Sequence, residues 1–284
     1  MSTMAIVGYT GSGKSHFAAL LYLHLNKIAD HRKLKVTADV DSHQFDVKET
    51  ANGLRYGIPL KPTPPGRSFQ AAIEVEFPGL FKDKRVHMPI IDLSGEAFSD
   101  IMGTAESHAS GNEEKPPAKS SKRYGVPDEK LSSEQREIFE ADAYCFIIDL
   151  PQELQTSRVN VEYSRFFQSL RAYREAHALG PPRTVSFIFT KEDECQDLLA
   201  ERLGEAPTAD QLTRYFAPDL HVEVRSSIYG PVHSFISSTK WHVPPEGDGN
   251  RGEFEVLLDA QSGQPIPNYP QQTYDQIVDW INDF

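Results

Sequence analysis

Short apolar or alternating runs are separated along the chain by longer segments in which apolar residues recur every three or four positions. The short runs predict strands at Met4–Val7, Lys33–Thr37, Phe69–Phe77, Arg85–Asp92, Ala143–Asp149, Thr184–Phe189, Val232–Ile236 and Glu253–Asp259. The longer segments predict helices at Ser15–Leu25, Asp41–Tyr56, Val159–His177 and Thr273–Phe284, with shorter helices near 194–203 and 208–216. Strands that alternate with helices imply an α/β fold with a mostly parallel sheet and helices on both faces.

Three segments depart from this alternation. The strands Phe69–Phe77 and Arg85–Asp92 follow each other closely and predict an antiparallel hairpin. Residues 57–66 hold four prolines, which fix φ and remove backbone donors, so regular structure is excluded there. Residues 103–136 are polar with almost no large apolar groups, and they predict an exposed, mobile insertion. No internal repeat or linker divides the chain, so we expect a single domain over residues 1–284.

Composition limits the classes of partner. The formal net charge of −12, from 29 basic and 41 acidic residues, disfavours nucleic acid and anionic membranes, because both bind clustered Lys and Arg. No leader sequence and no run of about 18 apolar residues is found, so we expect a cytoplasmic protein without direct membrane insertion. Cys145 and Cys195 lie in or beside predicted strands, where they are expected to be small buried groups rather than a disulfide.

The first predicted strand and helix are joined by a motif that binds phosphate. Residues 8–15 read Gly-Tyr-Thr-Gly-Ser-Gly-Lys-Ser and fit the pattern G-x-x-x-x-G-K-[ST]. The glycines let backbone N–H groups face phosphate oxygens, Lys14 reaches the β and γ phosphates, and the Ser15 hydroxyl ligates Mg²⁺. A helix that begins at this point also favours an anion. We therefore expect phosphates to contact Gly8, Thr10, Gly11, Ser12, Gly13, Lys14, Ser15 and His16.

A second motif, Asp92-Leu93-Ser94-Gly95, gives the pattern D-x-x-G at the end of a predicted strand. There the Asp92 carboxylate can hold Mg²⁺ through water, and the Gly95 N–H can meet a γ-phosphate. The ten histidines lack metal-ligand spacing, so Mg²⁺ carried in with nucleotide is the metal that the sequence implies.

A third motif selects the base. Thr190-Lys191-Glu192-Asp193 follows a buried strand and fits T/N-K-x-D. A carboxylate such as Asp193 accepts two hydrogen bonds, from guanine N1–H and N2–H₂, whereas adenine has an acceptor at the first position and no amine at the second. The Lys191 stem can cover the base, and Thr190 is expected to tie this loop to the phosphate loop. Ser238, Thr239 and Lys240 follow another strand, where a backbone N–H can bond guanine O6.

The phosphate loop, D-x-x-G, T-K-x-D and the segment Ser238–Lys240 occur in the order and at the strand ends that they have in a known family. On these residues the chain resembles the Ras-like GTPases of the translation-factor-related class, over about residues 1–100 and 140–284. The resemblance implies a three-layer P-loop NTPase fold, GTP or GDP with Mg²⁺ as ligands, and slow GTP hydrolysis by a molecular switch that a protein effector or activator reads. The layout around Gly57…Pro62-Thr63 and Asp92–Phe98 is similar to the bacterial double-GTPase group of multi-gene, conflict-type systems.

The switch residues are expected in the helix and proline-rich loop at 41–68 and after Asp92. Thr63 is the first choice for the hydroxyl that ligates Mg²⁺ and senses the γ-phosphate, with Ser68 as its rival, although a threonine in a surface loop explains Thr63 equally well. Glu96 stands where the family has a water-orienting glutamine, so it either orients water slowly or faces solvent. Arg67 is either a cis arginine finger or an ordinary exposed arginine. Lys14 completes the expected catalytic set.

Two other classes of function remain open from the sequence. One is a GTP- or GDP-binding interaction protein with little hydrolysis, which Glu96 favours because its charge repels phosphate. The other is an ATPase or nucleotide kinase that shares only the phosphate loop, and Asp193 argues against it.

Overall fold

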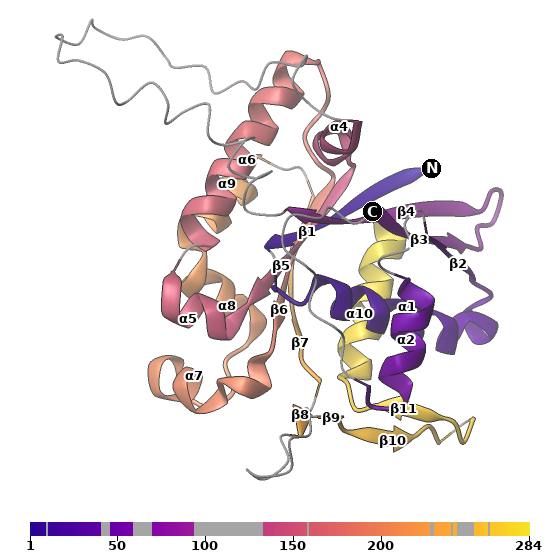
Figure 1. Cartoon of the computed structure of the whole chain (residues 1–284). Coiled ribbons are helices and arrows are strands. Elements are labelled where there is room, and N and C mark those ends of the chain that lie inside the picture. The colour runs from indigo at the N-terminus through magenta and orange to yellow at the C-terminus, as the bar shows by residue number, and fades with distance from the viewer. Residues whose placement is uncertain are drawn as a thin grey trace, which may run out of the picture.

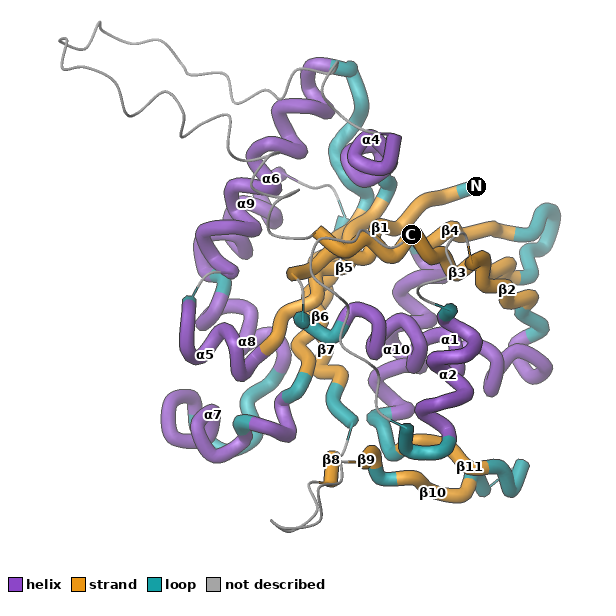
Figure 2. The backbone as a smooth tube through the Cα atoms, in the orientation of Figure 1, coloured by secondary structure: helices purple, strands orange, loops and turns teal. Residues whose placement is uncertain are grey.

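The computed structural model describes residues 1–9, 11–40, 46–58, 70–93, 133–157, 159–227, 230–239, 241–242, 253–260 and 262–284. Within these residues seven strands form one sheet in the order β2-β3-β4-β1-β5-β6-β7 (Figures 1 and 2). They are β1 (Ser2–Tyr9), β2 (Lys35–Val40), β3 (Gln70–Phe77), β4 (Lys84–Leu93), β5 (Ala143–Asp149), β6 (Thr184–Thr190) and β7 (Val232–Ser237). β3 runs antiparallel to both β2 and β4. The neighbouring strands β4, β1, β5, β6 and β7 are parallel to one another. The mostly parallel sheet with one antiparallel hairpin strand is confirmed.

Helices cover both faces of this sheet, as Figure 1 shows. One face packs on α1 (Lys14–Arg32), α2 (Val47–Arg55) and α10 (Gln271–Asp283). The other packs on α4 (Ser133–Glu140), α6 (Val159–Ala176), α8 (Ala209–Phe216) and α9 (Pro218–Ser227). Alternate residues of one strand enter opposite cores: in β5, Cys145 and Ile147 face the first core, and Phe146 and Ile148 the second. The three-layer arrangement expected of a P-loop NTPase fold is therefore present.

Several element boundaries differ from the sequence-based prediction. α1 continues past Leu25 to Arg32, and β2 begins at Lys35 because Lys33 ends the helix in the left-handed conformation at φ 56°. α2 starts at Val47 rather than near Asp41, because the Asp46 carboxylate caps it by accepting from the Lys48 and Glu49 N–H groups. The expected strand Glu253–Asp259 is wrong as a single element.

That segment divides between two small sheets. One pairs β8 (Trp241–His242) with β9 (Glu253–Phe254), and the other pairs β10 (Val256–Leu258) with β11 (Pro265–Pro267). Of the predicted insertion at 103–136, residues 133–136 open α4, and residues 103–132 lie outside the described part. The helices α7 (Gln196–Leu203), α8 and α10 lie where they were predicted, whereas α4, α5 (Leu150–Thr156) and α9 were not predicted.

The structure also bears on the two cysteines and on membrane-spanning helices. Cys145 and Cys195 are both buried and free, as expected for small apolar groups. Burial raises the pKa of the Cys145 thiol to about 12. Among the described helices, none combines the length and the apolar character needed to cross a bilayer.

Candidate functional site

The sequence motifs meet at one edge of the sheet. In the parallel register Gly8 on β1 lies opposite Asp92 on β4, and Thr190 on β6 lies opposite Asp149 on β5 and Ser237 on β7. The described connections that leave this edge include the phosphate loop (residues 8–15), the β6 loop (residues 190–194) and the β7 loop (residues 237–239). The carboxyl ends of strands in an open α/β sheet are where ligands bind.

The phosphate loop has the backbone that its glycines permit. Gly13 stands at φ 87°, and a Cβ there would also lie 3.3 Å from the Thr190 Oγ1 atom. At Gly8 an added Cβ would lie 2.6 Å from the Ser12 Oγ atom, so a side chain at either position would displace the neighbouring groups. α1 begins at Lys14, inside the last residues of this loop, with no side-chain cap and no acidic residue in its first turn. Its first N–H groups and its dipole therefore favour an anion at this place.

Lys14 places its charge inside the phosphate loop. The residue is only 4% exposed. Its ammonium group donates hydrogen bonds to the Gly8 carbonyl at 2.7 Å and to the Tyr9 carbonyl. Ser15 is half-buried in the first turn of α1. A cation held among carbonyl groups beside an uncapped helix start is chemically suited to phosphate oxygens.

The β6 loop is fastened to the phosphate loop. The Thr190 hydroxyl donates to the Ser12 carbonyl at 2.8 Å, which confirms the contact expected from the sequence. Lys191, in the left-handed conformation at φ 57°, donates from its ammonium group to the Gly11 carbonyl at 3.1 Å and to the Asp149 carboxylate. The short 3₁₀ helix Glu192–Glu194 follows and carries a half-buried Asp193.

The β7 loop contacts both of the other loops. The Ser238 hydroxyl accepts a hydrogen bond from the Glu192 N–H at 2.8 Å, and Thr239 Oγ1 lies 2.9 Å from His16 Nε2. Ser237, at the end of β7, shares a buried hydrogen bond with the Tyr274 hydroxyl of α10 at 2.7 Å. The phosphate, β6 and β7 loops are thus joined to one another by side chains.

Burial and neighbouring charge set the ionisation of this region. Burial and then the positive charge of Lys191 lower the pKa of His16 to about 4, so its imidazole is neutral at physiological pH. Burial, reinforced by nearby carboxylates beginning with Glu192 and Glu194, raises the pKa of the Cys195 thiol to about 12. Cys195 therefore stays protonated and offers no nucleophile to the site.

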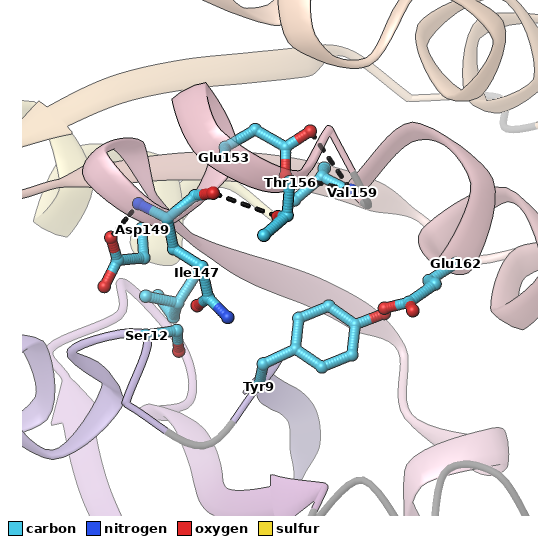
Figure 3. A pocket seen from close by; sticks show the side chains of 9 residues that line it. Tyr9, Ser12, Ile147, Asp149, Glu153, Thr156, Val159 and Glu162 are labelled. Carbon is cyan, nitrogen blue, oxygen red and sulfur yellow. Dashed lines mark hydrogen bonds between the residues drawn. The ribbon is translucent and has the colours of Figure 1, made fainter.

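A small cavity lies behind the phosphate loop, as Figure 3 shows. Its volume of about 30 Å³ suits one or two water molecules rather than a nucleotide. The Tyr9 side chain points toward Glu162 across it, and the Tyr9 ring stacks on Tyr163 with centroids 5.1 Å apart. Glu153, which is 3% exposed, accepts hydrogen bonds from the Val159 N–H at the start of α6. The contacts of Tyr9 with Tyr163 and Glu162 hold the start of the phosphate loop against α6.

Sequence reasoning missed several residues that shape the site. Asp149 holds Lys191, and its other oxygen caps α5 by accepting from the Gln152 N–H at 2.8 Å. Its position at the carboxyl end of a buried strand was an available signal, as it was for Asp92. Tyr9 and Tyr274 gave no comparable signal, because their roles depend on contacts with α6 and β7 that no local motif encodes.

Some expected site residues lie outside the described residues. They are Thr10, Thr63, Arg67, Ser68, Gly95, Glu96 and Lys240. For Asp92 the structure gives the backbone, which lies opposite Gly8 in the sheet. Among the residues that are described, no group of three or more His, Cys, Asp or Glu side chains is arranged to hold a metal ion.

Comparison with known proteins adds little to this geometry. No protein-family model matches the chain, and neither does any curated protein. A solved structure of Methanosarcina barkeri Roco2 RocCORdC bound to GDP resembles it with a TM-score of 0.30 and 13% identity. That match covers 84% of this chain and 43% of the other, so the chain spans less than half of the Roco2 chain. A likeness of this strength assigns no function, and the proposal below depends on the site itself.

Proposed function

We propose that this protein binds GTP and GDP with Mg²⁺, hydrolyses GTP, and acts as a molecular switch read by a protein partner. The observation that carries the proposal is the junction of three loops at one sheet edge. The Thr190–Ser12, Lys191–Gly11 and Glu192–Ser238 hydrogen bonds join a phosphate-binding motif to a guanine-binding motif.

The phosphate half of the proposed site is supported by Lys14 and the start of α1. The buried Lys14 ammonium and the uncapped N–H groups of α1 are complementary to the oxygens of a diphosphate or triphosphate. The close packing of Gly8 on Ser12 and of Gly13 on Thr190 keeps the loop backbone in the shape that presents these groups. We infer that the phosphates lie against residues 8–16.

The base half is supported by the position of Asp193. It lies in the 3₁₀ turn whose first N–H is held by Ser238 and whose preceding residue, Lys191, is fixed to Gly11 and Asp149. A carboxylate at this place pairs with guanine N1–H and N2–H₂ and is not complementary to adenine. The Lys191 stem would cover the base, and the β7 loop would meet guanine O6.

The metal would be held by oxygen groups next to the phosphates. Ser15, in the first turn of α1, and Asp92, opposite Gly8 on the adjacent strand, supply the hydroxyl and carboxylate that Mg²⁺ prefers, with Thr63 as the proposed third residue. When bound, Mg²⁺ would neutralise charge on the β- and γ-phosphate oxygens. Residues 41–68 and 93–102 would form the two switches that change order on hydrolysis.

The first experiment tests selectivity for guanine. Purified protein, freed of nucleotide, is expected to bind GDP and GTP at least about 100-fold more tightly than ATP in a calorimetric titration, because adenine leaves the Asp193 carboxylate unpaired. Identification of co-purified nucleotide by liquid chromatography provides an independent readout. Equal affinities for GTP and ATP would refute the guanine assignment.

A second candidate function is a nucleotide-dependent interaction protein with little hydrolysis, in which the surface around residues 103–136 binds the partner. Glu96 favours it, because a carboxylate in the water-orienting place adds negative charge beside the phosphates. Single-turnover hydrolysis of radiolabelled GTP separates the two functions.

Wild-type protein is expected to hydrolyse GTP slowly, on the order of 10⁻³ s⁻¹ or less. Glu96→Gln is expected to raise this rate several-fold, whereas Arg67→Ala and Thr63→Ala lower it. Ser68→Ala tests the rival position: a larger loss there than at Thr63 would assign the switch hydroxyl to Ser68. No wild-type turnover above buffer, even with candidate activators, would favour the second function.

A further inference from the structure

The three loops form a closed ring of contacts. Thr190 and Lys191 join the β6 loop to the phosphate loop, through the Ser12 and Gly11 carbonyls. The Glu192 N–H and the Ser238 hydroxyl join the β6 loop to the β7 loop. The remaining side of the ring is the contact between His16 and Thr239, 2.9 Å long, which joins the β7 loop back to the first turn of α1.

The His16–Thr239 contact differs in kind from the other sides of the ring. Each of the others uses a backbone group, whereas this one joins two side chains that are 223 residues apart in sequence. Thr239 is 7% exposed and His16 is half-buried, so water competes weakly for their hydrogen bond. The positive charge of Lys191 also helps to lower the pKa of His16, so the imidazole is within electrostatic range of the β6 loop as well.

From this geometry we infer that His16 is a positioning residue that fixes the spacing between the base-binding and phosphate-binding halves of the site. This inference rests on the proposed function, because it concerns a ligand that spans both halves. A nucleoside diphosphate must meet the β6 and β7 loops with its base and the phosphate loop with its phosphates. The ring holds these loops in place before the ligand arrives, and preorganisation of this kind raises affinity by reducing the ordering that binding requires.

The inference makes a prediction that depends on the length of the ligand. GDP engages both halves and gains from their fixed spacing, by the same reasoning that makes two linked contacts stronger than either alone. Inorganic diphosphate engages only the phosphate half. Loss of the His16–Thr239 contact should therefore weaken GDP binding and leave diphosphate binding nearly unchanged, because a phosphate at residue 16 would meet the backbone N–H of the first turn of α1, which every variant keeps.

The experiment is a double-mutant cycle measured by calorimetry with GDP and, separately, with inorganic diphosphate. His16→Leu and Thr239→Val remove the hydrogen bond while keeping apolar volume, and each is expected to weaken GDP binding about threefold to tenfold. The double variant should lose no more than either single variant, because all three lack the same contact. His16→Gln and Thr239→Ser keep a polar partner and should recover GDP affinity to within about twofold.

Melting temperatures of the nucleotide-free variants show whether each one folds. Losses that add in the double variant, or equal losses for GDP and diphosphate, would overturn the positioning role. If wild-type protein binds diphosphate but shows no preference for GDP over ATP, the proposed function fails instead. The two failures are therefore distinguishable.

Discussion

Asp193→Asn is expected to weaken GDP binding by about 100-fold or more, because two charge-assisted hydrogen bonds to guanine N1–H and N2–H₂ are lost together. The asparagine amide would present its own N–H donors toward the base. Xanthine carries a carbonyl where guanine carries the 2-amine, so xanthosine diphosphate should bind the variant more tightly than the wild type. Competition of both diphosphates against a fluorescent GDP analogue measures this exchange of preference.

A matched control is available one residue away. Glu192→Gln removes the same charge from the same 3₁₀ turn, and the Glu192 side chain contacts Gln196 Nε2 at 3.1 Å on the exposed side of the turn. Its GDP affinity should stay within about threefold of wild type, because the Glu192 side chain accepts from Gln196, whereas the contact of Glu192 with Ser238 uses the backbone N–H, which the variant keeps. If Glu192→Gln and Asp193→Asn weaken GDP equally and neither gains xanthosine diphosphate, Asp193 does not read the base.

The sheet was predictable because of how parallel strands are buried. β5 and β6 are covered on both faces, so each leaves a run of apolar residues in the sequence, Ala143–Ile148 in β5 and Phe187–Phe189 in β6. The hairpin of β3 and β4 was predictable from alternation and a short connection. The helices α5 (7 residues) and α9 (10 residues) were not predictable in this way, because neither carries a sustained helical repeat of apolar residues and their stability comes from packing more than from their own pattern.

Local signals for these helices were nevertheless present. α5 has Asp149 as its N-cap and a proline in its first turn, and α9 begins with Pro218. Both are start signals, because proline fits the first helical turn and Asp accepts from free N–H groups there. These start signals alone do not predict a helix, because no sustained helical repeat of apolar residues follows them.

The site divides in the same way. A motif fixes a backbone shape, so the phosphate loop and the Thr190–Ser12 tie could be predicted from spacing and family order. The contacts His16–Thr239, Lys191–Asp149 and Ser237–Tyr274 join side chains from different elements, and spacing along the chain says nothing about such distances. The proposed switch residues Thr63 and Glu96 remain predictions from the sequence.

Lys14→Met is expected to separate ligand binding from stability. Loss of the ammonium removes its charge-assisted hydrogen bonds to phosphate and should weaken GDP binding by about 100-fold. Methionine keeps a similar length and flexibility, so the buried space beside Gly8 and Tyr9 stays filled. Titration calorimetry gives the affinity, and thermal unfolding without nucleotide gives the stability.

The expected stability follows from the environment of Lys14 in this structure. Lys14 is 4% exposed as a residue, and burying its ammonium group is costly even with hydrogen bonds to the Gly8 and Tyr9 carbonyls. Replacing a buried charge by an apolar side chain of similar volume is often neutral or stabilising. The melting temperature of the nucleotide-free variant should therefore equal or exceed that of the wild type, although its affinity for GDP has fallen.

Lys82→Met is the control, because this lysine is exposed in the connection between β3 and β4, and neither quantity should change there. A nucleotide-free Lys14→Met protein that melts more than about 5 °C lower would make Lys14 a structural residue. If the Lys14→Met variant binds GDP as tightly as the wild type, the proposal that the phosphates lie against residues 8–15 is refuted. Opposite effects on stability and binding are what a residue retained for its ligand should give, since its charge is costly to the fold until phosphate is bound.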